Sequence, residues 1–187
     1  MKRQTATRGF RLHIGIYGQR NVGKSSLVNA LTRQDVAIVS DTPGTTTDPV
    51  SKPMELQPIG PVVLIDTAGL DDTGDLGNLR IKRTRAMLDR CELVLLVAVA
   101  NIWGDEDTRL LEELRQRNLP VIVVFNQSDK SQASAELVQL LEDQGVSVVA
   151  TSATKGTGIE DLRLAIIQTA AENKSGIPPL IRDLVPA

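Results

Sequence analysis

Residues 18–26, with the sequence Gly18-Gln19-Arg20-Asn21-Val22-Gly23-Lys24-Ser25-Ser26, decide the fold of this chain. Two glycines separated by four residues and followed by Lys and Ser form the pattern of a loop that wraps around phosphate groups. An apolar run over residues 12–17 precedes this loop, and apolar residues at helical spacing follow it at Leu27, Val28, Ala30 and Leu31. This context predicts a buried strand, a phosphate-binding loop (P-loop) and a helix.

The side chains of the P-loop suggest how a nucleotide would be held. Glycines let the backbone approach the phosphates, while successive N–H groups and the helix N-terminus attract their negative charge. Lys24 is expected to reach the β- and γ-phosphates, and the Ser25 hydroxyl to ligate a Mg²⁺ ion that bridges them. A glycine turn between a strand and a helix is the alternative, but a chance match to the whole pattern is rarer than about one in a hundred. The predicted nucleotide contacts here are Gly18, Asn21, Val22, Gly23, Lys24, Ser25 and Ser26.

Composition narrows the class of protein. The 187 residues suit one domain, and a net charge of −2 gives no general electrostatic case for binding nucleic acid or an anionic membrane. No apolar stretch approaches the roughly 20 residues of a membrane span. Cys91 is the single cysteine, so one chain can build neither a disulfide framework nor an iron–sulfur cluster held by several thiolates. We therefore expect a cytoplasmic protein with no membrane partner and no iron–sulfur cluster in this chain.

Apolar runs alternate with amphipathic segments along the chain. Such alternation predicts an α/β fold, in which a mostly parallel sheet is covered by helices on both faces. The short turn Pro58-Ile59-Gly60 allows only an antiparallel connection between its flanking strands. Six strands are expected, at residues 12–17, 51–57, 61–65, 93–100, 121–125 and 146–150. Beyond the helix after the P-loop, further helices are expected at residues 79–88, 108–117, 135–141 and 159–171.

The same pattern divides the chain into three parts. Residues 1–10 are predicted to be a flexible basic arm, residues 11–173 to form the nucleotide-binding domain, and the proline-containing residues 174–187 to begin a linker. Two long polar segments, 34–50 and 66–79, are too long for ordinary connections and are candidate functional loops.

A second motif, Asp66-Thr67-Ala68-Gly69, directly follows a predicted strand. Ligands of open α/β sheets bind at the carboxyl ends of the strands, which is where Asp66 is expected to lie. We predict that Asp66 holds the magnesium ion through water, and that the Gly69 N–H senses the γ-phosphate. Alone, this motif is a common turn, and its weight comes from its position downstream of a P-loop.

Two further stretches resemble the base-binding loops of GTPases. Asn126-Gln127-Ser128-Asp129 resembles the motif Asn-Lys-x-Asp, in which the Asp carboxylate accepts two hydrogen bonds from guanine. Adenine lacks the N2 amine, so GTP is favoured over ATP. Gln127 replaces the lysine that covers the base, so we expect guanine selectivity with modest affinity. Ser152-Ala153-Thr154 resembles the Ser-Ala-Lys loop whose backbone contacts guanine O6. Turns after strands are the structural alternative for both stretches.

Taken in order, these stretches resemble the translation-factor-like small GTPases, which implies a Ras-like P-loop fold. The stretch Pro43-Gly44-Thr45-Thr46-Thr47-Asp48 resembles the switch loop of the tRNA-modification and ribosome-assembly GTPases, and alignment on its Asp makes Thr46 the magnesium-binding threonine. The residue after Gly69 is Leu70, not the glutamine that orients water in Ras-like enzymes, so hydrolysis of GTP to GDP should be slow.

At a finer level, four segments resemble HydF, the GTPase of iron-only (FeFe) hydrogenase maturation: residues 44–50, 60–62, 71–77 and 183–187. HydF proteins add a dimerisation domain and a cluster-binding domain. The resemblance therefore implies a linker to a dimerisation domain after residue 173, dimer formation, and hydrogenase maturation enzymes and hydrogenase as partners of the full protein. Two alternatives remain open. One is the G domain of a tRNA-modification or ribosome-assembly GTPase, and the other is a nucleotide-binding regulatory module with negligible turnover.

Asn21 occupies the P-loop position that holds Asn in the potassium-dependent relatives. In those proteins the Asn side-chain oxygen helps to bind K⁺ beside the phosphates, where an arginine finger stands in other enzymes. The resemblance implies potassium-stimulated hydrolysis, with Asn21, Lys24, Thr46 and Gly69 as the catalytic set and Ser25, Thr46, Asp66 and Asn21 as the metal-binding set. An Asn that merely suits the turn is the alternative.

Overall fold

Six strands form a single sheet in the computed structural model, which describes residues 11–33, 51–66 and 86–173. The strand order is β2-β3-β1-β4-β5-β6, so β2 and β6 are the edges. The strands are β1 (Leu12–Tyr17), β2 (Ser51–Leu56), β3 (Gly60–Asp66), β4 (Leu93–Ala98), β5 (Val121–Phe125) and β6 (Ser147–Ala150). All six strands expected from the apolar runs are present.

The sheet is parallel except at one edge. β1 pairs in parallel with β3 and β4, β4 with β5, and β5 with β6, whereas β2 pairs antiparallel with β3. The short link between β2 and β3 explains the exception, because parallel strands require a long crossover. The predicted α/β class, with six strands and one of them antiparallel, is confirmed.

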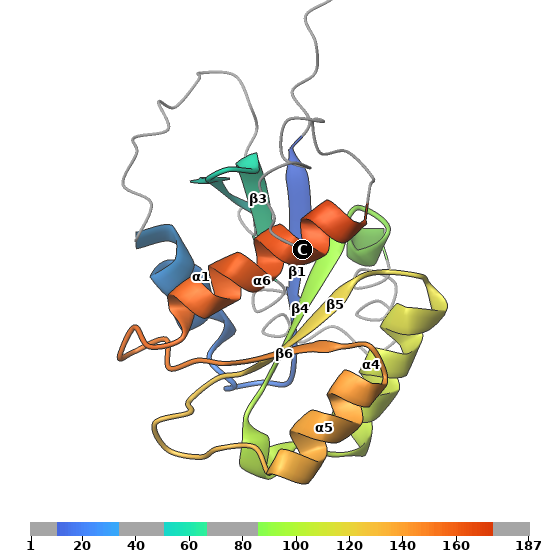
Figure 1. Cartoon of the computed structure of the whole chain (residues 1–187). Helices are drawn as coiled ribbons and strands as arrows, with labels where there is room; N and C mark the ends of the chain where they lie inside the picture. The colour runs from blue at the N-terminus through green and yellow to red at the C-terminus, as the bar shows by residue number, and fades with distance from the viewer. Residues whose placement is uncertain (1–10, 34–50, 67–85, 174–187) are drawn as a thin grey trace, which may run out of the picture.

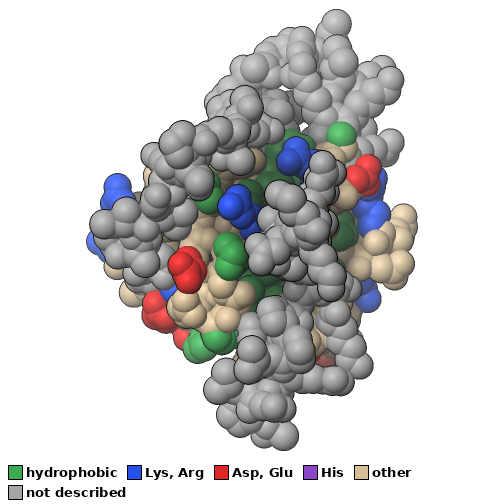
Figure 2. Space-filling model, turned by 90° about the horizontal axis from the view of Figure 1, so that it is seen from above, with side chains coloured by type: hydrophobic (Ala, Val, Ile, Leu, Met, Phe, Trp, Pro, Cys, Tyr) green, Lys and Arg blue, Asp and Glu red, His purple; other side chains and the backbone are tan. Residues whose placement is uncertain are grey.

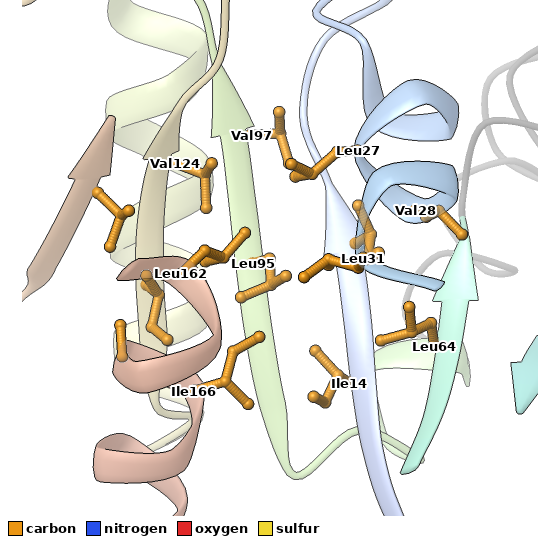
Figure 3. Packing of buried hydrophobic residues seen from close by; sticks show 14 of the residues in the cluster. Ile14, Leu27, Val28, Leu31, Leu64, Leu95, Val97, Val124, Leu162 and Ile166 are labelled. Carbon is orange, nitrogen blue, oxygen red and sulfur yellow. The ribbon is translucent and has the colours of Figure 1, made fainter. Parts of the chain in front are cut away.

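Helices cover both faces of this sheet (Figure 1). The described helices are α1 (Lys24–Arg33), the 3₁₀ turn η1 (Ala100–Ile102), α4 (Asp105–Gln116), α5 (Ala135–Asp143) and α6 (Ile159–Glu172). α1 and α6 pack on one face, and Figure 3 shows their side chains meeting those of the central strands. α4 and α5 pack on the other face. The central strand β4 is buried along its whole length, as its continuous apolar sequence requires.

The structure shifts some predicted boundaries. β4 ends at Ala98 and not at residue 100, because the next residues turn into η1. α4 begins at Asp105, three residues before its predicted start at 108, because the backbone N–H of Gly104 donates to the Asp107 carboxylate and caps the helix. Of the helix predicted at residues 79–88, only 86–88 lie within the described residues, and these are helical.

Several predicted regions lie outside the described residues. These are the arm at 1–10, the loop containing Thr46, the loop containing Gly69, and the segment at 174–187. Within the described ranges, no helix combines the length and the apolar character that crossing a bilayer demands. Figure 2 looks onto the molecule from above the view of Figure 1, and the basic side chains described on that face are spread among hydrophobic and acidic ones.

Candidate functional site

The carboxyl ends of the parallel strands carry most of the predicted site residues. In the register of β1 and β3, Ile16 lies opposite Asp66, so the P-loop after β1 begins beside this carboxylate. Phe125 of β5 lies opposite Ala150 of β6, so the two predicted base-binding loops leave the sheet side by side. The sheet therefore gathers the described parts of the site at one edge, as is typical of open α/β folds.

The P-loop is wound tightly enough to require glycine at two places. Gly18 has φ +147° and Gly23 has φ +93°, in the region that L side chains avoid. A Cβ at Gly18 would overlap the Val97 carbonyl, and one at Gly23 would overlap the Asn126 amide. Lys24 is only 4% exposed, and its ammonium donates to the carbonyls of Gly18 and Gln19, both at 2.8 Å. The loop thus encloses a fixed positive charge at the start of α1, which suits a phosphate chain.

Two oxygen ligands of the predicted metal set meet in the structure. The Ser25 hydroxyl donates to Asp66 Oδ2 at 3.1 Å, although 41 residues separate them in sequence. A hydroxyl and a carboxylate are oxygen donors of the kind that Mg²⁺ prefers. The chemistry of these two side chains therefore fits the predicted magnesium ligands. Thr46, the third predicted ligand, lies outside the described residues.

Asn126 joins the P-loop to the base-binding side of the site. Its side chain is 2% exposed, and its Nδ2 donates to the Val22 carbonyl at 2.9 Å. Its Oδ1 accepts from the Thr151 hydroxyl at 3.2 Å and from the Ala153 backbone N–H at 3.1 Å. Every one of these bonds is between loops that follow different strands. Asn126 is therefore a structural junction that fixes the loops after β1, β5 and β6 relative to one another.

The side chain of Asp129 is exposed, and one of its oxygens accepts a hydrogen bond from the loop after β6. The Ser152 hydroxyl donates to its Oδ1 at 2.7 Å, and this hydrogen bond is the main reason why the pKa of the Asp129 carboxyl lies below its usual value. The carboxylate is thus oriented and stays ionised at neutral pH, which is the state that can accept the two donors on the guanine edge. This hydrogen bond joins the two loops that carry the predicted base-binding motifs.

Gln127, which stands where the motif has a lysine, contacts the P-loop. Its backbone is left-handed, with φ +60°, and its Nε2 donates to the Asn21 carbonyl of the P-loop at 3.2 Å. Lys130 Nζ in turn donates to Gln127 Oε1 at 3.3 Å. Gln127 therefore links the base-binding loop to the P-loop without carrying a charge itself. Asn21 is exposed, with φ +64°, so its side chain stands at the surface of the P-loop.

The remaining predicted contacts lie around one hollow beside α1. Its wall is formed by P-loop residue Ser26, by Asn29 and Arg33 of α1, and by Ala153 and Thr154 of the loop after β6. The first turn of α1 and the predicted O6-binding loop therefore face a common space. The Ala153 backbone N–H donates to Asn126 Oδ1, so a guanine O6 that contacted this N–H would share it with Asn126.

Two features of the site were not found by sequence reasoning. Thr151 is fully buried and donates to Asn126, and its only signal in the sequence was a polar residue directly after a strand. The second is the pair of Gln19 and Asp107, whose side chains meet at 2.8 Å across 88 residues of sequence. No local pattern marks such a contact.

Most of the chain is similar in sequence to known proteins. The tRNA modification GTPase MnmE of Nitrosomonas europaea is 43% identical over 162 residues, which is 85% of this chain and 35% of that protein. The MnmE of Synechococcus elongatus is 40% identical over 159 residues, which is 83% of this chain and 34% of that protein. The chain therefore spans about a third of the length of the curated relatives it matches.

Solved structures share the fold. The G domain of the T. maritima FeoB iron transporter is 30% identical with a TM-score of 0.60, over 86% of this chain and 99% of that one. An Aquifex aeolicus Era variant, solved with GDP and AlF₄⁻, is 28% identical with a TM-score of 0.63, over 84% of this chain and 56% of that one. The Ras-like G-domain fold is thus confirmed. The family model described as 50S ribosome-binding GTPase matches residues 13–127, and the chain belongs to this GTPase family.

Proposed function

We propose that this chain is the GTP-binding and slowly GTP-hydrolysing switch domain of a tRNA-modification GTPase. The observation that carries the GTPase part is the junction at Asn126, which holds the P-loop and both base-binding loops in one arrangement. The tRNA-modification part is supported by the similarity to MnmE proteins. Such a role would place the protein in the cytoplasm.

The site residues divide the work by chemistry. Lys24 binds the β- and γ-phosphates, and Asp129 selects guanine because its carboxylate accepts from both N1–H and the N2 amine. Ser25 and Asp66 would hold Mg²⁺, which supplies positive charge at the phosphates when bound. Thr46 and Gly69 complete the proposed set by their motifs, as a metal ligand and a γ-phosphate sensor. Leu70 has no polar side-chain atom to orient water, in keeping with slow turnover.

Hydrogenase maturation is the weaker proposal. Of the four segments that resemble HydF, the structure describes only residues 60–62, which lie at the start of β3 after the β2–β3 turn. A short hairpin turn is a general solution for joining antiparallel strands and does not separate one GTPase subfamily from another. The relatives reported above favour tRNA modification instead.

A domain exchange tests the choice between these functions. The segment of Nitrosomonas europaea MnmE that matches this chain is replaced by residues 11–173, and the modification of tRNA is measured in cells that lack their own MnmE. We expect modification to be restored by this chimera and lost in a chimera that carries Lys24→Ala. An unmodified tRNA pool with a folded, GTP-binding chimera would contradict the tRNA-modification proposal.

Single-turnover GTP hydrolysis by the chain itself separates a GTPase from a regulatory module without turnover.

Potassium should accelerate GTP hydrolysis through Asn21. A cation held beside the phosphates offsets charge that develops on the leaving oxygens, as an arginine finger does for a factor of about 10³ to 10⁵. We expect turnover in potassium chloride to exceed turnover in equimolar sodium chloride by at least about tenfold for the wild type, and the two to be equal for Asn21→Ala. Equal rates of the wild type in the two salts would rule out the potassium site.

Replacing Gln127 with Lys should tighten nucleotide binding. The lysine ammonium can keep the donation to the Asn21 carbonyl and adds a charge-assisted bond, which is roughly twice as strong as a neutral one. We expect the dissociation rate of a fluorescent GDP analogue to fall by about threefold to tenfold. Gln132→Lys, at an exposed position in the same connection before α5, adds the same charge and is expected to leave the rate unchanged.

A further inference from the structure

The side chain of Gln19 ties the P-loop to the start of α4. Its Nε2 donates to Asp107 Oδ2 at 2.8 Å, and the backbone N–H of Gly104 donates to the same oxygen at 3.1 Å. Asp107 is only 2% exposed. One carboxylate oxygen therefore joins a residue of the P-loop to the N-cap of α4.

Capping alone does not account for the burial of Asp107. Exposed acidic residues at Asp105 and Glu106 already place negative charge in the first turn of α4, where it is favourable. Burial of a carboxylate is costly, and here it raises the pKa of Asp107. Two donors from other residues, the Gln19 amide and the Gly104 backbone N–H, offset that cost, and Gln19 is the one that comes from outside the helix and its cap.

Gln19 continues this connection to the phosphate-binding lysine. Its backbone carbonyl accepts from Lys24 Nζ at 2.8 Å, beside the equal contact from Lys24 to Gly18. The side chain and the carbonyl of one residue thus connect the buried carboxylate to the ammonium. A change in the position of Gln19 would move an acceptor that sets where the ammonium lies.

The same helix cap also lies close to the base-binding loop. Trp103, which precedes Gly104, packs edge-on against Phe125 with ring centroids 5.5 Å apart. Phe125 is the residue before Asn126 at the end of β5. Residues 103–107 therefore contact the P-loop, through Asp107, and the end of β5, through Trp103.

We propose that Gln19 and Asp107 are positioning residues for nucleotide binding: the buried Asp107 carboxylate orients Gln19, and Gln19 orients Lys24 toward the phosphates. This inference rests on the proposed GTP-binding function. It assigns to α4 a part in setting affinity for the phosphates, although no residue of α4 belongs to a nucleotide-binding motif.

The first test compares two Gln→Leu variants. Gln19→Leu removes the amide that faces Asp107. Gln139→Leu removes an amide that donates to Asp143 at the same distance, 2.8 Å, on the exposed face of α5. Affinity for a fluorescent GDP analogue is measured at a temperature where circular dichroism shows every variant to be folded. We expect Gln19→Leu to weaken GDP binding about tenfold, as for the loss of one hydrogen bond to a charged group, and Gln139→Leu to bind like the wild type.

The second test uses the carboxylate. The donors from Gln19 and Gly104 approach the same oxygen, so Asp107→Asn can keep the acceptor. We expect the GDP affinity of Asp107→Asn to lie within about threefold of the wild type and that of Asp107→Ala to fall about tenfold. Because the two residues act through one contact, adding Gln19→Leu to Asp107→Ala should cause no further loss of affinity. The emission of Trp103, the single tryptophan, should respond to GDP in the wild type and less in Asp107→Ala.

Three results would overturn the proposal. Equal GDP affinities of Gln19→Leu and the wild type would show that the contact serves the fold alone. Fully additive losses in the double variant would show that the two residues do not act through one contact. Equal losses for Asp107→Asn and Asp107→Ala would show that the acceptor oxygen is not what matters. A wild type that binds no GDP would instead refute the GTP-binding function on which the inference rests.

Discussion

Asp129→Asn is expected to weaken GTP binding by at least about a hundredfold while leaving the protein able to bind xanthosine triphosphate tightly. Guanine presents N1–H and an N2 amine to this side chain, and a carboxylate accepts from both. The Asn side chain has an NH₂ group in place of one carboxylate oxygen, and this donor would face a donor of guanine. Xanthine carries an oxygen in place of the amine, so the same amide donor finds an acceptor there.

The structure indicates which way the new amide would point. The Ser152 hydroxyl donates to Asp129 Oδ1 at 2.7 Å, and an Asn at 129 can keep its oxygen at this place. Its NH₂ group would then replace Oδ2, the oxygen that Ser152 leaves free for the base edge. Ser152→Ala in the Asp129→Asn background should remove this preference and reduce the discrimination between the two nucleotides.

Competition between GTP and xanthosine triphosphate for a fluorescent GDP analogue measures the effect. Asp143→Asn makes the same chemical change on the exposed surface of α5 and should leave both affinities unchanged. If Asp129→Asn weakened both nucleotides equally, Asp129 would not read the base edge.

Gly23→Ala is expected to abolish nucleotide binding. No binding should be seen even at GDP concentrations about a hundredfold above those that saturate the wild type. The new methyl group would overlap Nδ2 of Asn126. To make room, Asn126 must withdraw from the Val22 carbonyl and from the Thr151 and Ala153 donors, and each buried group left unpaired costs about 1–3 kcal/mol. The loops of the site would then no longer be held in one arrangement.

Gly60→Ala provides a closely matched control. Gly60 has φ +94°, against +93° for Gly23, so an L side chain is unfavourable for the backbone at both positions. A Cβ at Gly60 meets no atom within 4 Å. Chemical denaturation should show a loss of about 1 kcal/mol in the free energy of unfolding for Gly60→Ala and a larger loss for Gly23→Ala, with normal GDP binding in the former. Equal stability and equal binding of the two variants would contradict the role given to Asn126.

The fold could be predicted from the sequence because its signals are local. β5 is a run of five buried apolar residues, and its predicted limits, 121–125, agree with the structure. The β2–β3 pair was predictable because a three-residue turn excludes a parallel arrangement. The start of α4 was misplaced because its N-cap residue is Gly104, which has no side chain to mark the cap, and the capping acceptor is the Asp107 carboxylate three residues further on.

The candidate site was predictable at the level of motifs and not of contacts. Lys24, Ser25, Asn126 and Asp129 stand in recognisable patterns, and the structure brings them to one edge of the sheet. The bonds from Asn126 to Thr151 and from Gln19 to Asp107 join residues 25 and 88 positions apart, and no periodicity reports them. The same limit applies to the subfamily. Short matches suggested HydF, whereas similarity over most of the chain favours MnmE, because many weak agreements together outweigh a few short ones.

The two edges of the sheet bear on how copies of this chain could associate. An exposed edge strand is a template on which another molecule can add its own strand. β2 carries the exposed residues Lys52 and Pro53, and a proline within a strand is tolerated where its nitrogen faces away from the neighbouring strand. That edge therefore lacks a donor at its middle. β6 is only four residues long. Neither edge favours the addition of a strand, so a dimer that uses this domain would form through helices or loops and not by extending the sheet.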